Sequence, residues 1–148
     1  MSLKIAIASD HGGFELKQKI IKLLIDLKNE YEDFGSYTEE SVDYPDYAFL
    51  VGSKVANKEF DRGILICGTG VGISIAANKV KGIRCALVHD VFTAKVTRQH
   101  NDSNIIAMGG RVIGDELAKM IVKTWLEEEF MGEHHVDRID KIANYEAN

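Results

Sequence analysis

A cysteine and three glycines stand close together in the stretch ILICGTGVGISIAAN, from Ile64 to Asn78. Cys67 ends an apolar run, and Gly68, Gly70 and Gly72 follow it. Loop N–H groups that lead into a helix N-terminus favour negative charge, and glycine lets the backbone approach a ligand closely. The same field favours a thiolate at the cysteine. A thiolate beside such donors can remove a proton next to a carbonyl group while the N–H groups hold the enediolate oxygen.

Other interpretations of this stretch stay open. A cysteine is often simply a small buried apolar residue, and Cys85 within IRCALV is interpreted in that way. The loop is not a P-loop, because no Gly-Lys-Ser/Thr ends it. The dinucleotide fingerprint fits at Gly68 and Gly70, but Ile73 stands where glycine or alanine is needed. Asp90, about twenty residues downstream, keeps a nicotinamide-dependent oxidoreductase as an alternative.

Polar residues that could bind a substrate recur elsewhere in the chain. Asp10 and His11 follow the apolar run KIAIAS, and Arg111 follows NIIAMGG. Asp10 could equally cap the next helix, and Arg111 could be a solvated surface charge. His100 and Asn101 could be a basic residue in the last turn of a helix and its C-cap.

The tail contains the segment GEHHVDR. His134 and His135 are adjacent and therefore do not converge on one ion, and no HxxxH pattern or cysteine stands nearby, so we predict no metal site there. Arg138, taken alone, is typical of a surface charge.

The elements that must position these residues follow from hydrophobic periodicity. Short β-rich runs at 4–9, 31–35, 62–67, 82–88 and 104–109 alternate with helix-period segments, among them 71–79 and 91–100. Five strands that alternate with helices indicate right-handed crossovers and a parallel sheet with helices on both faces. After the last long helix, Val136, Ile139 and Ile142 recur at intervals of three in the tail.

This arrangement predicts a site at one edge of the sheet. The carboxyl ends of parallel strands share one edge, and ligands bind there where the strand order reverses. The residues that directly follow the predicted strands are Asp10, His11, Cys67 with its loop, His89, Asp90 and Arg111. An acid, imidazoles, a thiol, an anion loop and an arginine are therefore expected along one edge.

Composition narrows the class of protein. The chain has 148 residues, of which 45% are hydrophobic and 28% charged, which suits one domain with a real core. A formal net charge of -5 without a basic patch argues against nucleic acid and anionic membranes as partners. No apolar run approaches the roughly 20 residues of a membrane span, and we expect no signal peptide. Two cysteines do not form a disulfide framework, so a cytoplasmic protein is expected.

With these residues in view, the chain resembles the type B ribose-5-phosphate isomerases, of the family that also includes galactose-6-phosphate and allose-6-phosphate isomerases. The resemblance covers nearly the whole length, and its motifs occur in order: SDHGGFELK, SVDYPDYA, ICGTGVGISIAANKV, TRQHND, GGRVIG and the tail. It implies a Rossmann-like three-layer α/β/α sandwich with a five-stranded parallel sheet and a C-terminal helical tail. It also implies a homodimer with shared active sites, or a tetramer, and aldose–ketose isomerisation in the pentose phosphate pathway without metal or organic cofactor.

The resemblance also implies roles for residues around the sugar. Cys67 would be the base that moves the proton between C1 and C2, with the Thr69 hydroxyl beside it. The N–H groups offered to the enediolate would be those of Gly68, Gly70, Val71 and Gly72. Asp10 and His100 would bind the sugar and help to open its ring. Tyr44 and Asn101 would contact substrate hydroxyls.

For the phosphate, the resemblance implies His11 and Arg111 from one subunit and Arg138 from the other, with tail 132–148 packing on the partner. His134 stands where many members carry a second tail arginine, and a histidine is only partly charged near neutral pH and lacks the planar fork of arginine. We count His134 among the substrate-binding residues, and this change bears on the preferred sugar. Ribose 5-phosphate is the expected substrate, with allose 6-phosphate as the alternative. A non-catalytic sugar-phosphate sensor is a further alternative, although a sensor needs no base.

Overall fold

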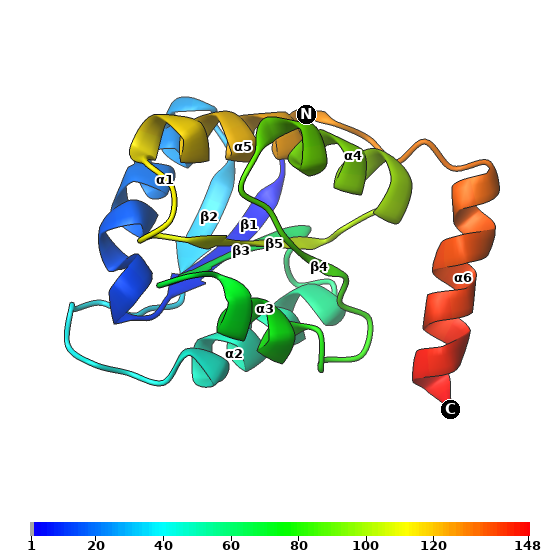
Figure 1. Cartoon of the computed structure of the whole chain (residues 1–148), viewed down its shortest axis with the longest axis horizontal. Helices are drawn as coiled ribbons and strands as arrows, with labels where there is room; N and C mark the ends of the chain where they lie inside the picture. The colour runs from blue at the N-terminus through cyan, green and yellow to red at the C-terminus, as the bar shows by residue number, and fades with distance from the viewer. Residues whose placement is uncertain (1) are drawn as a thin grey trace.

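The computed structural model describes residues 2–148; Met1, the first residue of the predicted domain 1–148, lies outside the described part. Five parallel strands form one sheet in the order β2-β1-β3-β5-β4 (Figure 1). The strands are β1 Lys4–Ser9, β2 Glu30–Asp33, β3 Arg62–Cys67, β4 Cys85–Leu87 and β5 Ile105–Gly109. The helices are α1 Phe14–Asp26, α2 Tyr44–Ala56, α3 Val71–Ala77, α4 Val91–Asn101, α5 Asp115–Glu127 and α6 His134–Ala147, with a 3-10 turn at His11–Gly13. The predicted five-stranded α/β sandwich with a helical tail is confirmed.

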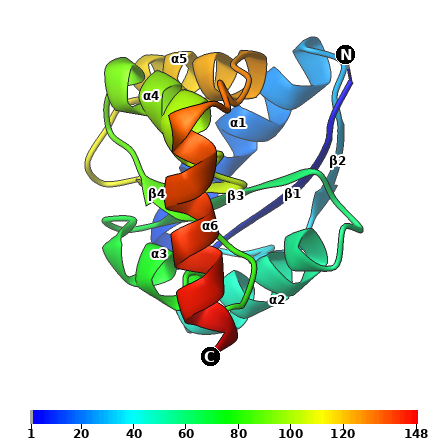
Figure 2. The same cartoon turned by 90° about the vertical axis from the view of Figure 1, so that its right-hand side faces the viewer.

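The sheet separates two apolar cores. Helices α1, α4 and α5 cover one face, and α2 and α3 cover the other (Figure 2). Side chains alternate between the faces along each strand, so Ile5 and Ile7 of β1 join the first core while Ala6 and Ala8 join the second. The small alanines leave room for α2 and α3 to lie close against the sheet.

Helix α3 and strand β4 are among the elements that are shorter than their patterns predict. Helix α3 ends at Ala77 rather than Lys79, because the Asn78 side chain turns to the next strand: it donates to Cys85 O (2.9 Å) and accepts from Cys85 N (2.8 Å). Strand β4 begins at Cys85 rather than at residue 82, since Gly82 has a left-handed φ of 90°. The C-cap of α4 is Asp102, at φ 46°, so the expectation that Asn101 caps this helix is wrong by one residue.

Helix α6 stands at one side of the molecule, beside α4 (Figure 1). Its contacts with the body include a hydrogen bond from Gly82 N to Glu146 Oε1 at 2.7 Å. Within the helix only His135 is buried, while Val136 and Ile142 of its apolar stripe are 40% and 56% exposed. The stripe that would hold such a helix against a protein therefore lies largely uncovered in a single chain.

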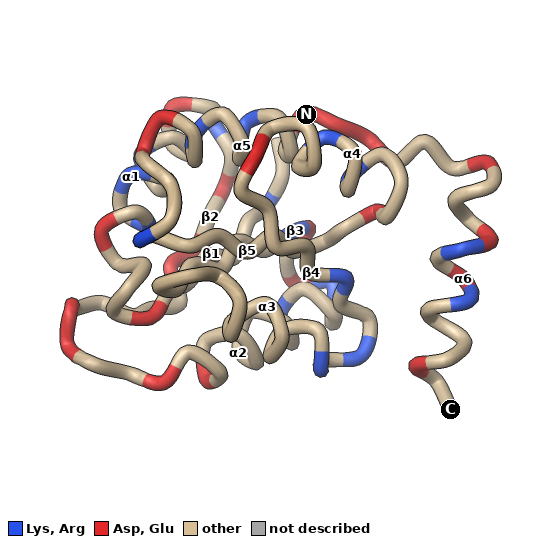
Figure 3. The backbone as a smooth tube through the Cα atoms, in the orientation of Figure 1, with Lys and Arg blue, Asp and Glu red and all other residues tan. Residues whose placement is uncertain are grey.

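Charges of both signs are spread along the chain, with blue segments gathered where it enters β4 (Figure 3). None of the helices in residues 2–148 is long and apolar enough to cross a membrane.

A buried lysine ties α1 to the connection between β2 and α2. The Lys17 side chain is fully buried, and its Nζ donates to Asp33 Oδ1 at 2.7 Å and to the Ser36 carbonyl. A buried charge is tolerated only when it is paired in this way. Lys17 thus fixes the start of segment 36–43, which leads to Tyr44 at the candidate site.

Lys17→Met should lower the free energy of unfolding by about 3 kcal/mol, because it leaves Asp33 and the Ser36 carbonyl without their partner. Urea unfolding measures the loss. The matched control is Lys19→Met on the exposed face of the same helix, which should stay within about 0.5 kcal/mol of the parent. Equal stabilities for the two variants would contradict a stabilising role for the buried pair.

Candidate active site

The carboxyl ends of β1, β3 and β5 bring three predicted segments together. A Cβ built on Gly12 would lie 3.0 Å from Gly68 N and 3.3 Å from Asp10 Oδ1. A Cβ built on Gly68 would lie 3.2 Å from Nη1 of Arg111. The turn after β1, the loop after β3 and the arginine after β5 are therefore in close contact, and glycine is needed where the backbones approach.

Cys67 ends β3 with its side chain turned toward its own loop. It is 4% exposed, and its Sγ accepts the N–H of Gly70 at 3.2 Å. Gly70 adopts a φ of 79°, which bends the chain back so that this N–H faces the sulfur. This hydrogen bond holds the sulfur against the loop that follows β3.

The loop keeps some N–H groups free and uses others. Within residues 2–148, Gly68 N and Gly72 N have no hydrogen-bond acceptor. Gly70 N is used by the thiol, and Val71 N donates to Thr69 Oγ1 at 3.2 Å. Of the four N–H groups that the resemblance assigns to the enediolate, two are thus free to bind an oxyanion here.

Tyr44 lies over this loop. A Cβ built on Gly72 would lie only 2.6 Å from Cζ of the Tyr44 ring and 2.9 Å from its hydroxyl oxygen. The phenol therefore packs closely against Gly72. This position suits the predicted contact of Tyr44 with a substrate hydroxyl.

His11 and Arg111 line one pocket, as expected of residues that hold a phosphate. The other lining residues are Gly12, Glu15, Leu16, Glu39 and Gly110. The Val42 N–H donates to His11 Nδ1 at 3.2 Å. Because Nδ1 accepts, the neutral ring carries its proton on Nε2, which leaves that N–H to donate to an anion.

Asp10 caps a helical turn, which the sequence analysis gave as the alternative to sugar binding. It is 6% exposed, and its Oδ1 accepts the Gly12 N–H at 2.8 Å, which caps the turn His11–Gly13. The cap orients the carboxylate beside the Cys67 loop without using its second oxygen. The two interpretations are compatible, because one oxygen can cap while the other binds a sugar hydroxyl.

The remaining predicted residues lie elsewhere in the chain. Helix α4 starts at the carboxyl edge and runs back over about 16 Å, so His100 and Asn101 lie near the amino ends of the strands. There Arg84, directly before β4, donates from Nε to Asn101 O at 3.0 Å.

A single chain thus separates the predicted site residues into two groups. The carboxyl-edge group comprises Asp10, His11, Tyr44, the loop Cys67–Gly72 and Arg111, and the α4–α6 group comprises His100, Asn101, His134 and Arg138.

The α4–α6 group is organised by a histidine that the sequence analysis considered only as a metal ligand. His135 is 6% exposed and stacks on His100 with ring centroids 4.2 Å apart and planes 14° apart. The His134 ring packs against it at 4.1 Å. Burial, followed by the positive charges of His134, His100 and Arg138, lowers the pKa of His135. In the described residues no group of histidine, cysteine and carboxylate side chains is arranged to hold a metal ion.

At the carboxyl edge, His89 makes a hydrogen bond that helps to hold the backbone of the site in place. Its Nε2 accepts the Gly109 N–H at 2.9 Å, and Gly109 packs against the backbone of Thr69. Burial lowers the pKa of His89, and the nearby Asp90 opposes this shift only in part. The position of His89 directly after a strand was the signal in the sequence, but its role as an acceptor for a backbone N–H was not predictable from that position.

Replacing His89 with glutamine should reduce the acid sensitivity of the fold. Since its folded pKa lies below the unfolded value of about 6.5, the unfolded chain takes up the proton first, and stability falls as the pH drops below about 6.5. Glutamine can still accept the Gly109 N–H but does not titrate. The loss of unfolding free energy between about pH 7 and pH 5, measured in urea, should be smaller in His89→Gln. If the loss of unfolding free energy over this pH range is the same in His89→Gln as in the parent, the acid sensitivity comes from other groups such as His135.

Asp90 does not serve a nicotinamide in this structure. Its carboxylate caps α4, with Oδ1 accepting Thr93 N at 2.7 Å and Oδ2 accepting the Thr93 hydroxyl at 2.8 Å. These hydrogen bonds lower the pKa of Asp90. The residue that kept the dinucleotide interpretation open is thus a helix cap.

Comparison with known proteins agrees with this fold. Residues 5–142 match the family model described as Ribose/Galactose Isomerase. Ribose-5-phosphate isomerase B of Escherichia coli is 50% identical over 143 residues, which are 97% of this chain and 96% of that protein. The structure of ribose-5-phosphate isomerase B from Clostridium thermocellum superimposes with a TM-score of 0.97 at 52% identity, covering 98% of each chain. That of the Mycoplasma genitalium enzyme with bound ribulose-5-phosphate has a TM-score of 0.94 at 46% identity, covering 100% and 99%.

The fold is thus that of an α/β isomerase. More particularly, the chain belongs to the ribose/galactose isomerase family. The resemblance stated from the motifs is confirmed at the level of the family.

Proposed function

We propose that the protein interconverts ribose 5-phosphate and ribulose 5-phosphate, an aldose–ketose step of the pentose phosphate pathway, without metal or cofactor. The observation that carries this is Cys67, buried at the end of β3 beside free Gly68 and Gly72 N–H groups. A base next to an oxyanion cradle is what proton transfer between two adjacent carbons requires. Relatives named as this isomerase support the substrate, as does a related enzyme with bound ribulose-5-phosphate.

The reaction uses the carboxyl-edge group together with His100 of the α4–α6 group. With the ring opened by Asp10 and His100, the Cys67 thiolate takes the proton from C2 of the aldose, and the electron pair moves onto the carbonyl oxygen. The N–H groups of Gly68 and Gly72 stabilise the enediolate. The thiol then returns the proton to C1 while the hydroxyl proton moves from O2 to O1, which gives the ketose. Thr69 and Tyr44 position the oxygens.

We further propose that each site is shared between two copies of the chain. The α4–α6 group lies away from the carboxyl edge of its own chain, so His100, Asn101, His134 and Arg138 would come from the partner. Exposed apolar side chains surround the cysteine loop, among them Val71, Ile75, Leu87 and Phe92. Together with the uncovered stripe of α6, they supply the apolar area that a symmetric dimer buries.

The phosphate would then be held from both sides. His11 donates from Nε2 and Arg111 from its guanidinium in one subunit, while Arg138 and His134 approach from the other. Residues 1–148 act as one domain, with tail 132–148 packing on the partner, in a homodimer or a tetramer built from it. Both cysteines are free thiols, which agrees with a cytoplasmic enzyme.

The direct test is to add purified protein to ribose 5-phosphate and to follow ribulose 5-phosphate by NMR, with and without EDTA. We expect turnover that EDTA leaves unchanged. Allose 6-phosphate is the alternative substrate, because His134 lacks the planar fork of arginine and this change bears on the preferred sugar. Faster turnover of allose 6-phosphate would make it the substrate. Binding of these sugar phosphates without turnover would indicate a sensor instead.

A further inference from the structure

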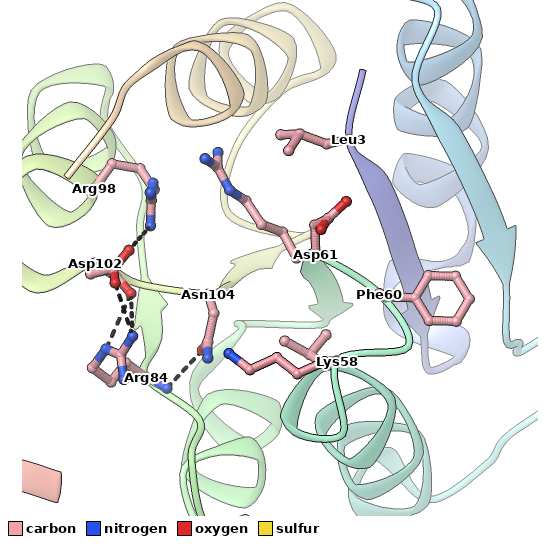
Figure 4. Close-up of a pocket in the computed structure, with 10 residues that line it drawn as sticks. Leu3, Lys58, Phe60, Asp61, Arg84, Arg98, Asp102 and Asn104 are labelled. Carbon is pink, nitrogen blue, oxygen red and sulfur yellow. Dashed lines mark hydrogen bonds and ion pairs between the residues drawn. The ribbon is translucent and has the colours of Figure 1, made fainter. Parts of the chain in front are cut away.

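A second polar pocket, drawn in Figure 4, lies at the amino ends of the strands, whereas the cysteine loop follows the carboxyl end of β3. It is formed where the chain enters β1, β3, β4 and β5, and no residue of the carboxyl-edge group lines it. Its lining residues are Leu3, Val55, Lys58, Phe60, Asp61, Arg62, Arg84, Arg98, Asp102 and Asn104. We call it the amino-edge pocket.

The amino-edge pocket carries more positive than negative charge. Its lining has four basic side chains and two carboxylates, in a chain whose formal net charge is -5. The Asp102 carboxylate is shared by Arg98 at 2.7 Å and Arg84 at 3.4 Å. The other carboxylate, Asp61, accepts the backbone N–H of Lys4 at 2.8 Å. The acids are thus engaged, and an excess of positive charge faces the pocket.

The arginines are held in place through only some of their nitrogen atoms. Arg98 is 6% exposed, and its Nη1 donates to Asp102 and to Ser103 O, each at 2.7 Å. Arg62 donates from Nη1 to Trp125 O at 2.8 Å. Fixed guanidinium groups lose little further entropy on binding a ligand, which favours recognition of an oxyanion.

Several donors around the pocket remain without an acceptor. In residues 2–148 these are Nη2 of Arg62, Nη2 of Arg98, Nη1 of Arg84 and Nζ of Lys58. Figure 4 shows the Lys58 side chain reaching into the pocket toward Asn104. These nitrogen atoms reach the surface, since Ser9 Oγ is the single buried side-chain N or O atom without a partner in the described chain. A ligand from solvent can therefore bind them.

The surroundings of Arg62 favour the binding of an anion. Burial and the nearby Arg98 charge lower the pKa of Arg62 to about 10, and Asp102, Asp61 and Glu129 offset this shift only in part. A bound oxyanion would compensate the guanidinium charge that its own neighbours leave uncompensated.

We propose that the amino-edge pocket is a second oxyanion site, which binds a phosphate group through Arg62, Arg84 and Lys58. The phosphate is either free inorganic phosphate or the phosphate of a small ester, whose organic part would lie against Leu3, Val55 and Phe60. This site does not depend on the isomerase reaction, because none of these residues belongs to the carboxyl-edge group.

The test measures binding of inorganic phosphate to the full chain by calorimetry in a low-salt buffer. The Arg111→Ala background weakens binding at the carboxyl edge, so the remaining phosphate site is expected to be the amino-edge pocket. In this background Lys58→Gln and Arg62→Gln should each weaken phosphate binding about tenfold, the loss expected for one charged hydrogen bond. The matched control is Lys19→Gln, at an exposed lysine that does not line the pocket, and it should change nothing.

Ribose 5-phosphate in place of inorganic phosphate distinguishes the two sources when Arg111→Ala is compared with Arg111→Ala/Lys58→Gln, since a larger loss of affinity for the ester than for inorganic phosphate on Lys58→Gln would identify a phosphorylated metabolite. Lys58 is exposed and makes no ion pair, so Lys58→Gln keeps the test valid even if Arg62→Gln fails to fold. Loss of all phosphate binding in Arg111→Ala would overturn the proposal. So would a remaining site that neither pocket substitution weakens.

Discussion

Replacing Cys67 with alanine should abolish isomerisation while leaving the binding of sugar phosphate nearly intact. A positioned base contributes roughly 10²–10⁴-fold to the rate, and the 4% exposure of Cys67 leaves little room for a water molecule to take its place. The proposed phosphate ligands His11 and Arg111 follow other strands, so affinity should change less than about twofold, well below the effect of a lost charged hydrogen bond. Turnover is measured as ketose formation by NMR, and affinity by calorimetry with ribose 5-phosphate.

Two further variants show whether the loss of activity in Cys67→Ala comes from the missing base or from altered packing. Cys67→Ser keeps an acceptor for the Gly70 N–H but supplies a far weaker base, so it should be nearly as inactive as Cys67→Ala. Cys85→Ala is the control for loss of a cysteine: burial raises the pKa of the Cys85 thiol to about 12, and its substitution should leave kcat unchanged. Near-normal turnover in Cys67→Ala would return Cys67 to the role of a core residue.

Mixing two inactive variants should restore activity if the site is shared between subunits. Cys67→Ala damages the carboxyl-edge group, and His100→Asn damages the α4–α6 group. After subunit exchange, half of the dimers are mixed, and each mixed dimer contains one intact site and one doubly damaged site. About a quarter of the wild-type activity should therefore return, far above the average of the two parents.

The matched control mixes Cys67→Ala with Asp10→Asn, two changes within the carboxyl-edge group. Asparagine preserves the helix cap, so the fold is maintained. Every site of a mixed dimer then carries one defect, and no activity should return. Native mass spectrometry must show that subunits have exchanged. If exchange is complete and the first pair also stays at the parental average, His100 and Cys67 act within one chain, and the proposed sharing of sites is wrong.

The parts of the fold that depend on local pattern were predictable. The apolar runs of β1, β3 and β5 indicated a buried sheet, and their order with the helices placed Asp10, Cys67 and Arg111 at one edge. The contacts between distant segments were not predictable. Lys17 looks like any helix lysine until the fold brings Asp33 and the Ser36 carbonyl against it. His135 looks like half of an adjacent pair until it stacks on His100.

The division of the site residues into the carboxyl-edge group and the α4–α6 group was likewise not predictable from local pattern. His100 stands eleven positions after His89 in the sequence, yet α4 carries it to the far end of the strands. Sequence motifs record which residues a reaction needs, but not which of them a single chain can bring together. That information lies in the direction and length of the helix between them.

The position of Trp125 gives the molecule a built-in optical reporter. It is the only tryptophan of the chain, fully buried, with its Nε1 donating to Ser103 Oγ at 2.9 Å and the Arg62 guanidinium 5.2 Å from its ring. Intrinsic indole fluorescence should therefore shift to longer wavelength when the core opens. It should also respond to an anion that draws Arg62 away from the ring. A sugar phosphate bound at the carboxyl edge should leave the emission nearly unchanged, because no other indole lies there to sense it.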